Sequence, residues 1–228
     1  MNKRLIINNS QKVFNISLES IKGREEYIEV VPSNYAEIKQ ELRKLADDTD
    51  DFIIRNDKKY LIYQTPTIDD ELVGLLFDYG EEVVYYTNTI APTHIIEKVA
   101  RNRYTSSIMY SSLSPISYER AENIQEASTA GQVSLDVYLT GDMTPFDVIV
   151  SLSKVRYAVD KVYIDFNRDV YDTYEKEYKF FNELRDPMSA WKMNIIINYV
   201  TEEEKDYLEE QAAIDRKKRV ISTTWEQH

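Results

Sequence analysis

Residues 60–87 read YLIYQTPTIDDELVGLLFDYGEEVVYYT, in which two β-rich segments flank a helical one. Leu72, Leu75 and Leu76 follow the i, i+3, i+4 spacing of one helix face, and Gly80 stands where a helix would be capped at its C-terminus. The flanking segments 60–63 and 83–87 are rich in aromatic and β-branched residues, as strands are. The stretch therefore predicts a strand–helix–strand unit with its helix over about residues 69–79.

The same alternation extends from Tyr27 to the end of the chain and predicts about eight strands separated by seven helices. Asn34, Pro92 and Thr144-Pro145 stand where helices are expected to begin. Alternation of this kind predicts an α/β protein with a mostly parallel sheet. The sheet would either curve into a partial or complete TIM-like (βα) barrel or stay open and doubly wound. We favour the barrel.

The first residues follow a different pattern. Segments 4–8 and 13–18 are β-rich and flank the polar stretch Asn9-Ser10-Gln11, which predicts a small N-terminal β-hairpin. We therefore expect a hairpin extension over residues 1–26 and one α/β barrel-like domain over residues 27–228.

Composition excludes several functions. The net charge of −12 argues against a protein that binds duplex nucleic acid through phosphate contacts. The chain has no cysteine, so disulfides, thiolate zinc sites and cysteine-ligated iron–sulfur clusters are excluded. The only histidines are His94 and His228, too few for a His-rich metal site. No apolar run approaches the roughly 20 residues that span a bilayer, so we expect a cytoplasmic protein without membrane contact.

Polar residues follow several predicted strands, and these are the first candidates for a ligand site. In a parallel sheet the carboxyl ends of the strands meet on one face, where such folds bind ligands. Polar residues at these places also serve as ordinary helix caps and turns. The candidates of this kind for ligand binding are Thr87, Asn88, Ser111, Thr140 and Asn198.

An acidic loop supplies a second type of candidate. Asp165, Asn167 and Asp169 have the spacing with which oxygen ligands surround a hard cation. Val170 and Lys176 replace the glycine and glutamate of an EF-hand loop, so a looser magnesium site or an ordinary polar turn remains. Together with Asp142, the carboxylates of Asp165 and Asp169 are the candidates for catalysis.

The order of segments in residues 60–215 resembles the barrel of radical S-adenosylmethionine enzymes. In that family a strand runs into Gly-Gly-Glu-Pro, and after a helix the next strand ends in Thr-Asn-Gly. Pro66 matches the proline of the first motif, and Thr87-Asn88 match the start of the second. The resemblance implies a (βα) barrel and a S-adenosylmethionine site that includes Gln64, Thr65 and Pro66.

The chain also departs from that family. The cysteine loop expected after the first strand is replaced by Pro32-Ser33-Asn34, so the usual iron–sulfur cluster cannot be held. Gln64 and Thr65 replace a glycine and the glutamate of the first motif, and Thr89 replaces the glycine of the second. The resemblance therefore implies a cysteine-free relative that no longer performs radical chemistry.

Three functions remain open. The first is a non-catalytic or regulatory protein that binds a small molecule, such as S-adenosylmethionine, or a protein partner. The second is a metal-assisted hydrolase or phosphotransferase that uses a divalent cation with Asp142, Asp165 and Asp169. The third is a structural component of a larger assembly, such as a virus particle, in which the N-terminal hairpin supplies an edge strand for pairing.

Overall fold

The computed structural model describes residues 3–8, 15–20, 27–47, 55–167, 169–191 and 194–199, and parts of 203–215. In the described residues after Tyr27, strands and helices alternate, as the sequence predicts. The strands are β3 (Tyr27–Val30), β4 (Lys59–Tyr63), β5 (Glu82–Thr87), β6 (Ser106–Ser112), β7 (Gln132–Leu139), β8 (Lys161–Phe166) and β9 (Asn194–Tyr199). The helices between them are α1 (Tyr35–Asp47), α2 (Asp70–Tyr79), α3 (Thr93–Arg101), α4 (Tyr118–Ala130), α5 (Pro145–Val155) and α6 (Tyr174–Trp191).

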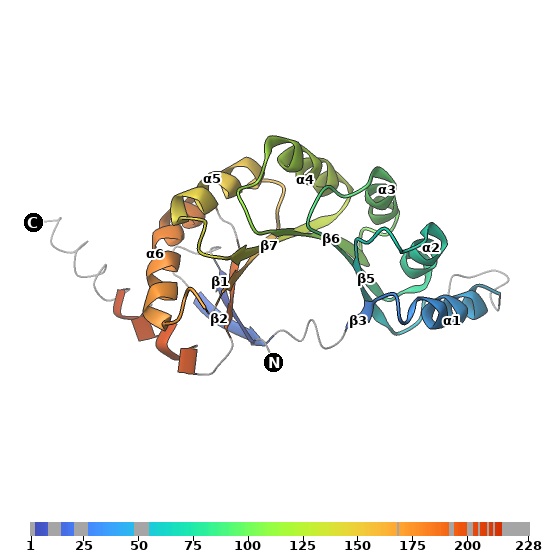
Figure 1. Cartoon of the computed structure of the whole chain (residues 1–228), viewed down its shortest axis with the longest axis horizontal. Helices are drawn as coiled ribbons and strands as arrows, with labels where there is room; N and C mark the ends of the chain where they lie inside the picture. The colour runs from blue at the N-terminus through green and yellow to red at the C-terminus, as the bar shows by residue number, and fades with distance from the viewer. Residues whose placement is uncertain are drawn as a thin grey trace, which may run out of the picture.

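The strands β3 to β9 lie in the sheet in the order in which they occur in the chain, and each neighbouring pair is parallel. The order never reverses, so the doubly wound alternative is excluded. Figure 1 shows the sheet curved into an arc with the helices on its outer side. The predicted partial (βα) barrel is therefore confirmed, with β3 and β2 at the two ends of the sheet in the described part of the chain.

Two N-terminal strands extend this sheet. β1 (Lys3–Asn8) pairs antiparallel with β2 (Asn15–Ser20) on one side and with β9 on the other. Residues 9–14, which would form the turn of the predicted hairpin, lie outside the described residues. The domain boundary at residue 26 stays a prediction. The β-rich segments at 52–54 and 220–221 also lie outside the described residues.

Local signals set the ends of α2 and α5. The Asp69 carboxylate accepts a hydrogen bond from the Leu72 amide at 2.7 Å, and the Gly80 amide donates to the Leu76 carbonyl at 2.9 Å. Thr144 and Asp147 form a reciprocal capping box at the start of α5. These hydrogen bonds hold the pKa of Asp147 below its usual range. The helix starts and ends predicted at these residues are confirmed.

Asn34 behaves differently from the prediction. It directly precedes α1, but its side chain turns back towards the edge strand β3. Its Oδ1 accepts from the Val31 amide at 2.9 Å and its Nδ2 donates to the Glu29 carbonyl at 2.8 Å. Asn34 therefore closes the end of β3, where sequence reasoning expected a helix cap.

The hydrophobic core lies between the outer face of the sheet and the helices. Alternate strand residues such as Ile62, Tyr85 and Ile108 are buried in one cluster with the apolar faces of the helices. Burial raises the pKa of Tyr85 to about 12. Since strand side chains alternate between the two faces, the residues between these point to the inner side of the arc, which no labelled helix covers in Figure 1.

Within the described residues, none of the helices is long and apolar enough to cross a membrane.

Leu135 of β7 gives a test of the packing between the sheet and the helices. Leu135 is fully buried, whereas Leu113 is 54% exposed. We expect Leu135→Ala to lower the free energy of unfolding by about 2–5 kcal/mol, because it leaves a cavity in the core. The control Leu113→Ala should change it by no more than about 0.5 kcal/mol. Urea denaturation of both variants measures the difference, and equal values would contradict the packing.

Candidate functional site

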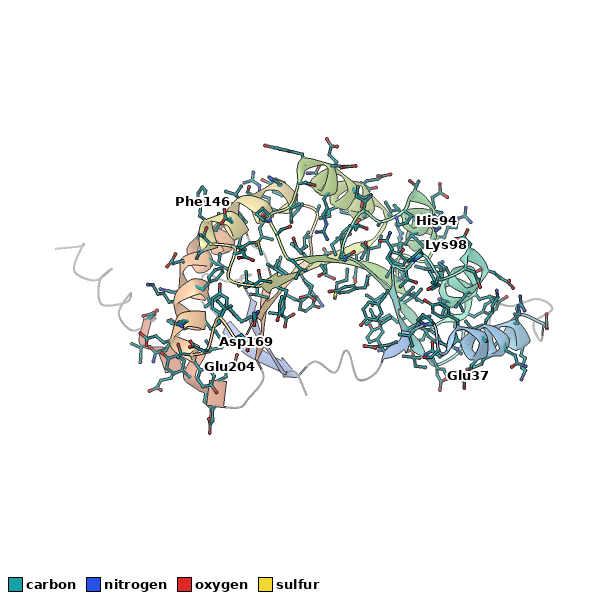
Figure 2. The ribbon with its side chains drawn as sticks, in the orientation of Figure 1. Glu37, His94, Lys98, Phe146, Asp169 and Glu204 are labelled. Atoms are coloured by element: carbon teal, nitrogen blue, oxygen red, sulfur yellow. The ribbon has the colours of Figure 1, made fainter. Side chains whose placement is uncertain are left out.

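The inner face of the arc carries rows of side chains that run across neighbouring strands. In one row Tyr86 of β5 is paired with Met109 of β6, Met109 with Ser134 of β7, and Ser134 with Lys161 of β8. A neighbouring row contains Val84, Ser107 and Gln132, paired in the same way. Side chains extend into the hollow of the arc in Figure 2.

These rows line a half-open pocket of about 330 Å³, which we call the concave pocket. It is lined by Tyr27, Leu61, Glu82, Val84, Tyr86, Ser107, Met109, Gln132, Val133, Ser134, Asp160, Lys161 and Tyr163. Glu82, Gln132 and Lys161 are the first residues of β5, β7 and β8. The concave pocket therefore lies towards the amino ends of the strands, whereas sequence reasoning placed the ligand site at their carboxyl ends.

Side-chain size explains why the sheet is hollow here. The two central strands of the pocket present Ser107 and Ser134, which are among the smallest polar residues. The strands on either side present the large rings of Tyr86 and Tyr163. The small side chains of Ser107 and Ser134, beside Met109 and between two tyrosines, leave a space at the centre of the inner face. The volume is at the lower end of the roughly 300–1,000 Å³ typical of small-molecule sites.

The polar groups on this floor are available to a ligand. Among the described residues, the hydroxyls of Ser107 and Ser134 and the carboxamide of Gln132 have no hydrogen-bond partner. The charged groups at the rim are more restricted. The Lys59 ammonium lies 3.4 Å from the Glu82 carboxylate, and the Asp160 carboxylate accepts the Val133 amide at 3.1 Å. The concave pocket thus combines a rim at which Glu82 and Asp160 are engaged, and Lys161 makes no such contact within the described residues, with open hydrogen-bonding groups on its floor.

At the carboxyl ends, in contrast, the predicted ligand residues bond to one another. The side-chain oxygen Oε1 of Gln64 accepts a hydrogen bond from the hydroxyl of Thr87. It accepts a second, at 3.2 Å, from the hydroxyl of Thr89. Thr65 is hydrogen-bonded to the Tyr35 hydroxyl at 3.1 Å. The structure therefore brings Gln64 and Thr87 together as predicted. Their hydrogen bonds are made within the protein, as in a closed turn.

The other predicted ligand residues are spread along this edge. Pro66 and Asn88 are exposed, and the Ser111 carbonyl accepts a hydrogen bond from the Arg120 guanidinium. The Thr140 hydroxyl donates to Asp142 at 3.1 Å across Gly141, whose φ of 101° favours glycine. Asn198 belongs to β9, whose side chains lie outside the described part of the structure.

The metal candidates occupy two loops and a strand. Asp165 is half-buried in β8, and Asn167 accepts the amide of Asp169 at 3.0 Å, which is an ordinary polar turn. Asp169 and Asp142 are exposed, and Figure 2 shows Asp169 beside the α6 end of the arc. Over the described ranges of the chain, no three His, Asp or Glu side chains form a group that could hold a metal ion.

Tyrosines and carboxylates connect β3 to β7 across the inner face. The Tyr86 hydroxyl donates to Asp136 at 3.3 Å, and the Tyr63 hydroxyl donates to Glu29 at 3.1 Å. The rings of Tyr63 and Tyr86 meet edge to face at 5.4 Å. Asp136 is only 4% exposed. These contacts fix the orientation of the Tyr86 ring, which forms one wall of the concave pocket.

Arg120 supports the same region from α4. Its guanidinium carbon lies 5.9 Å from the centre of the Tyr110 ring. Burial lowers the pKa of Arg120, while the phenols of Tyr110 and Tyr86 act in the opposite direction. His94, in contrast, projects from α3 on the outer side of the arc, 3.6 Å from Asp70 (Figure 2). The His94 side chain is 52% exposed, so it is a surface residue of α3.

Sequence reasoning missed the concave pocket. The signal was clearest in β7, where Gln132, Ser134 and Asp136 alternate with Val133, Leu135 and Val137. Polar residues at every second position of a strand indicate a face that is not packed against helices. Sequence reasoning looked for ligand residues at strand ends, whereas Ser107 and Ser134 lie within their strands.

The hydrogen bonds of Gln64 predict a structural role. Thr87 is 1% exposed, so Gln64→Ala removes an acceptor from a buried hydroxyl and should lower the free energy of unfolding by about 1–3 kcal/mol. Gln64→Glu keeps an acceptor oxygen at the same position and should cost less than half as much. Urea denaturation measures both. If the alanine variant is as stable as the wild type, these hydrogen bonds do not hold the turn.

Comparison with known proteins does not assign a family. No protein-family model matches the chain, and no curated protein matches it. The resemblance to radical S-adenosylmethionine enzymes therefore stays a hypothesis.

Proposed function

We propose that this protein binds a small molecule in the concave pocket and does not transform it. The observation that carries the proposal is the contrast between the two ends of the sheet. At the carboxyl ends Gln64, Thr87 and Thr89 are bonded to one another, whereas Ser107 and Ser134 in the concave pocket have no protein partner within the described residues. Polar groups on the floor of a cavity bind either water or a ligand.

The chemistry of the pocket supports binding over catalysis. General acid–base catalysis requires a side chain that is positioned to exchange a proton with the substrate. Asp160 and Glu82, the carboxylates of the lining, are engaged by the Val133 amide and by Lys59. Within the described residues, no His is adjacent to the hydroxyls of Ser107 and Ser134, because His94 lies on the outer side of the arc (Figure 2).

We also propose that the partial barrel descends from that of radical S-adenosylmethionine enzymes. The open arc of parallel strands and the position of Pro66 and Thr87-Asn88 at strand ends support this descent. The iron–sulfur cluster of that family does not fit the chain, which has no cysteine. Ligand binding in the concave pocket would then be a function that the barrel gained at the amino ends of its strands.

A thermal-shift screen tests the binding proposal. The probes are S-adenosylmethionine, nucleosides, free heterocyclic bases, simple sugars, Mg²⁺ and Ca²⁺. A ligand at one hundred times its Kd stabilises the folded state by about 2.7 kcal/mol, and we expect at least one organic probe to raise the Tm. The probe should be recovered unchanged after incubation.

Two variants locate the effect. Ser134→Phe fills the floor of the concave pocket and should abolish the shift, whereas Ser153→Phe on the exposed side of α5 should leave it intact. The Tm of each variant without ligand shows whether it folds. The proposed binding site is wrong if no organic probe stabilises the protein. It is also wrong if the shift survives Ser134→Phe; with S-adenosylmethionine, that result would place the site near Pro66 and Asn88.

A further inference from the structure

We infer that the ligand of the concave pocket is an uncharged, flat heteroaromatic compound with hydrogen-bonding groups at the edge of its ring. This inference rests on the proposed function, because it specifies what the concave pocket binds. It follows from the shape of the pocket, from the number of open hydrogen-bonding groups and from the charges at the rim.

The shape favours a flat ring. The walls Tyr86 and Tyr163 belong to β5 and β8, which are three strand spacings apart, or about 14 Å along the sheet. Between them the floor is formed by Ser107, Met109 and Ser134 on β6 and β7. This distance is too great for one ring to stack against both tyrosines at once. A flat ring system that lies across β6 and β7 would meet the floor with its face and the tyrosines with its edges.

The floor is also suited to the face of an aromatic ring. Leu61 and Val84 give the pocket an apolar side, and the thioether of Met109 lies in the middle row. Sulfur–aromatic contacts are favourable, and aromatic rings meet tyrosines readily edge to face.

The number of open hydrogen-bonding groups limits the ligand further. Within the described residues, the side chains of Ser107, Gln132 and Ser134 are without partners. Two hydroxyls and one carboxamide can pair with the few ring nitrogens and carbonyl groups of a heterocycle. A pyranose carries hydroxyls around its whole ring, and the unpaired ones would be buried at a cost. The carboxylates that could accept them, Glu82 and Asp160, already have partners.

The charges argue for a neutral compound. Lys59, Glu82, Asp160 and Lys161 at the rim carry two positive and two negative charges, which cancel. The whole chain carries a net charge of −12, so a phosphorylated compound is repelled at long range. For a cationic compound, the two carboxylates of the lining, Glu82 and Asp160, are each already shared with a protein group, and Lys161 adds a repelling charge. The unmodified heterocycle is therefore preferred over its phosphorylated or cationic derivatives.

Methyl NMR of the methionines tests this inference directly. Met109 lies on the pocket floor, whereas Met143 is 4% exposed in the core and serves as an internal control. The probes are hypoxanthine, pterin, glucose, inosine 5′-monophosphate and putrescine, titrated into the full-length protein. Met109→Leu assigns the signal.

We expect hypoxanthine or pterin to move the Met109 methyl signal upfield, since the face of an aromatic ring shields a nucleus beneath it, and to leave Met143 unchanged. Ser134→Ala and Gln132→Ala should each weaken this binding about five-fold through one lost hydrogen bond. Inosine 5′-monophosphate should bind less tightly than hypoxanthine, while glucose and putrescine should not move the Met109 signal.

Two results would overturn the inference and are distinguishable from failure of the proposed function. If neither heterocycle moves the Met109 signal, or if glucose or putrescine binds more tightly and loses its binding in Ser134→Phe, the ligand class is wrong. In the second case the pocket still binds a small molecule. The proposed function itself fails if no organic probe of the thermal-shift screen stabilises the protein in a manner that depends on Ser134.

Discussion

The structure depends on the unbroken order of parallel pairing from β3 to β9. Crossovers between parallel neighbours are right-handed in about 98% of cases, so strands that follow one another in the same direction place their helices on one face. The apolar half of every strand packs against those helices and forms the core. The other half is left facing the inside of an arc. The exposed inner face, and the concave pocket within it, are consequences of this single topological constraint.

Much of the fold could be predicted from the sequence because its signals are local. The Leu72–Leu75–Leu76 stripe, the Gly80 cap and the Thr144-Pro145 helix start are set by neighbouring residues, and the structure confirms them. The curvature of the sheet is not local. The choice between a barrel and an open sheet depends on which strands are neighbours in space, and only the structure shows that order. The role of Asn34 was predicted wrongly because an Asn before a helix can bond either to the first turn of the helix or to the preceding strand. Here its side chain bonds to the strand.

The candidate site was harder to predict for a related reason. Polar residues at strand ends were visible in the sequence, but whether they bond to each other or remain open depends on their spatial neighbours. Gln64 and Thr87 are 23 residues apart and satisfy one another. Ser107 and Ser134 look unremarkable in the chain, and only the register of β5 to β8 places them between Tyr86 and Tyr163. What distinguishes the two groups is the contacts they make, which residue type does not reveal.

The Asn34 side chain has a consequence for how the molecule behaves at high concentration. A sheet that does not close into a complete barrel has an edge strand, and free main-chain groups on such a strand invite pairing with another chain and growth into aggregates. Here β3 is only four residues long, and Asn34 bonds to the Glu29 carbonyl and the Val31 amide at its end. One amide side chain thus occupies two of the main-chain groups with which an added strand could pair at this end of the sheet.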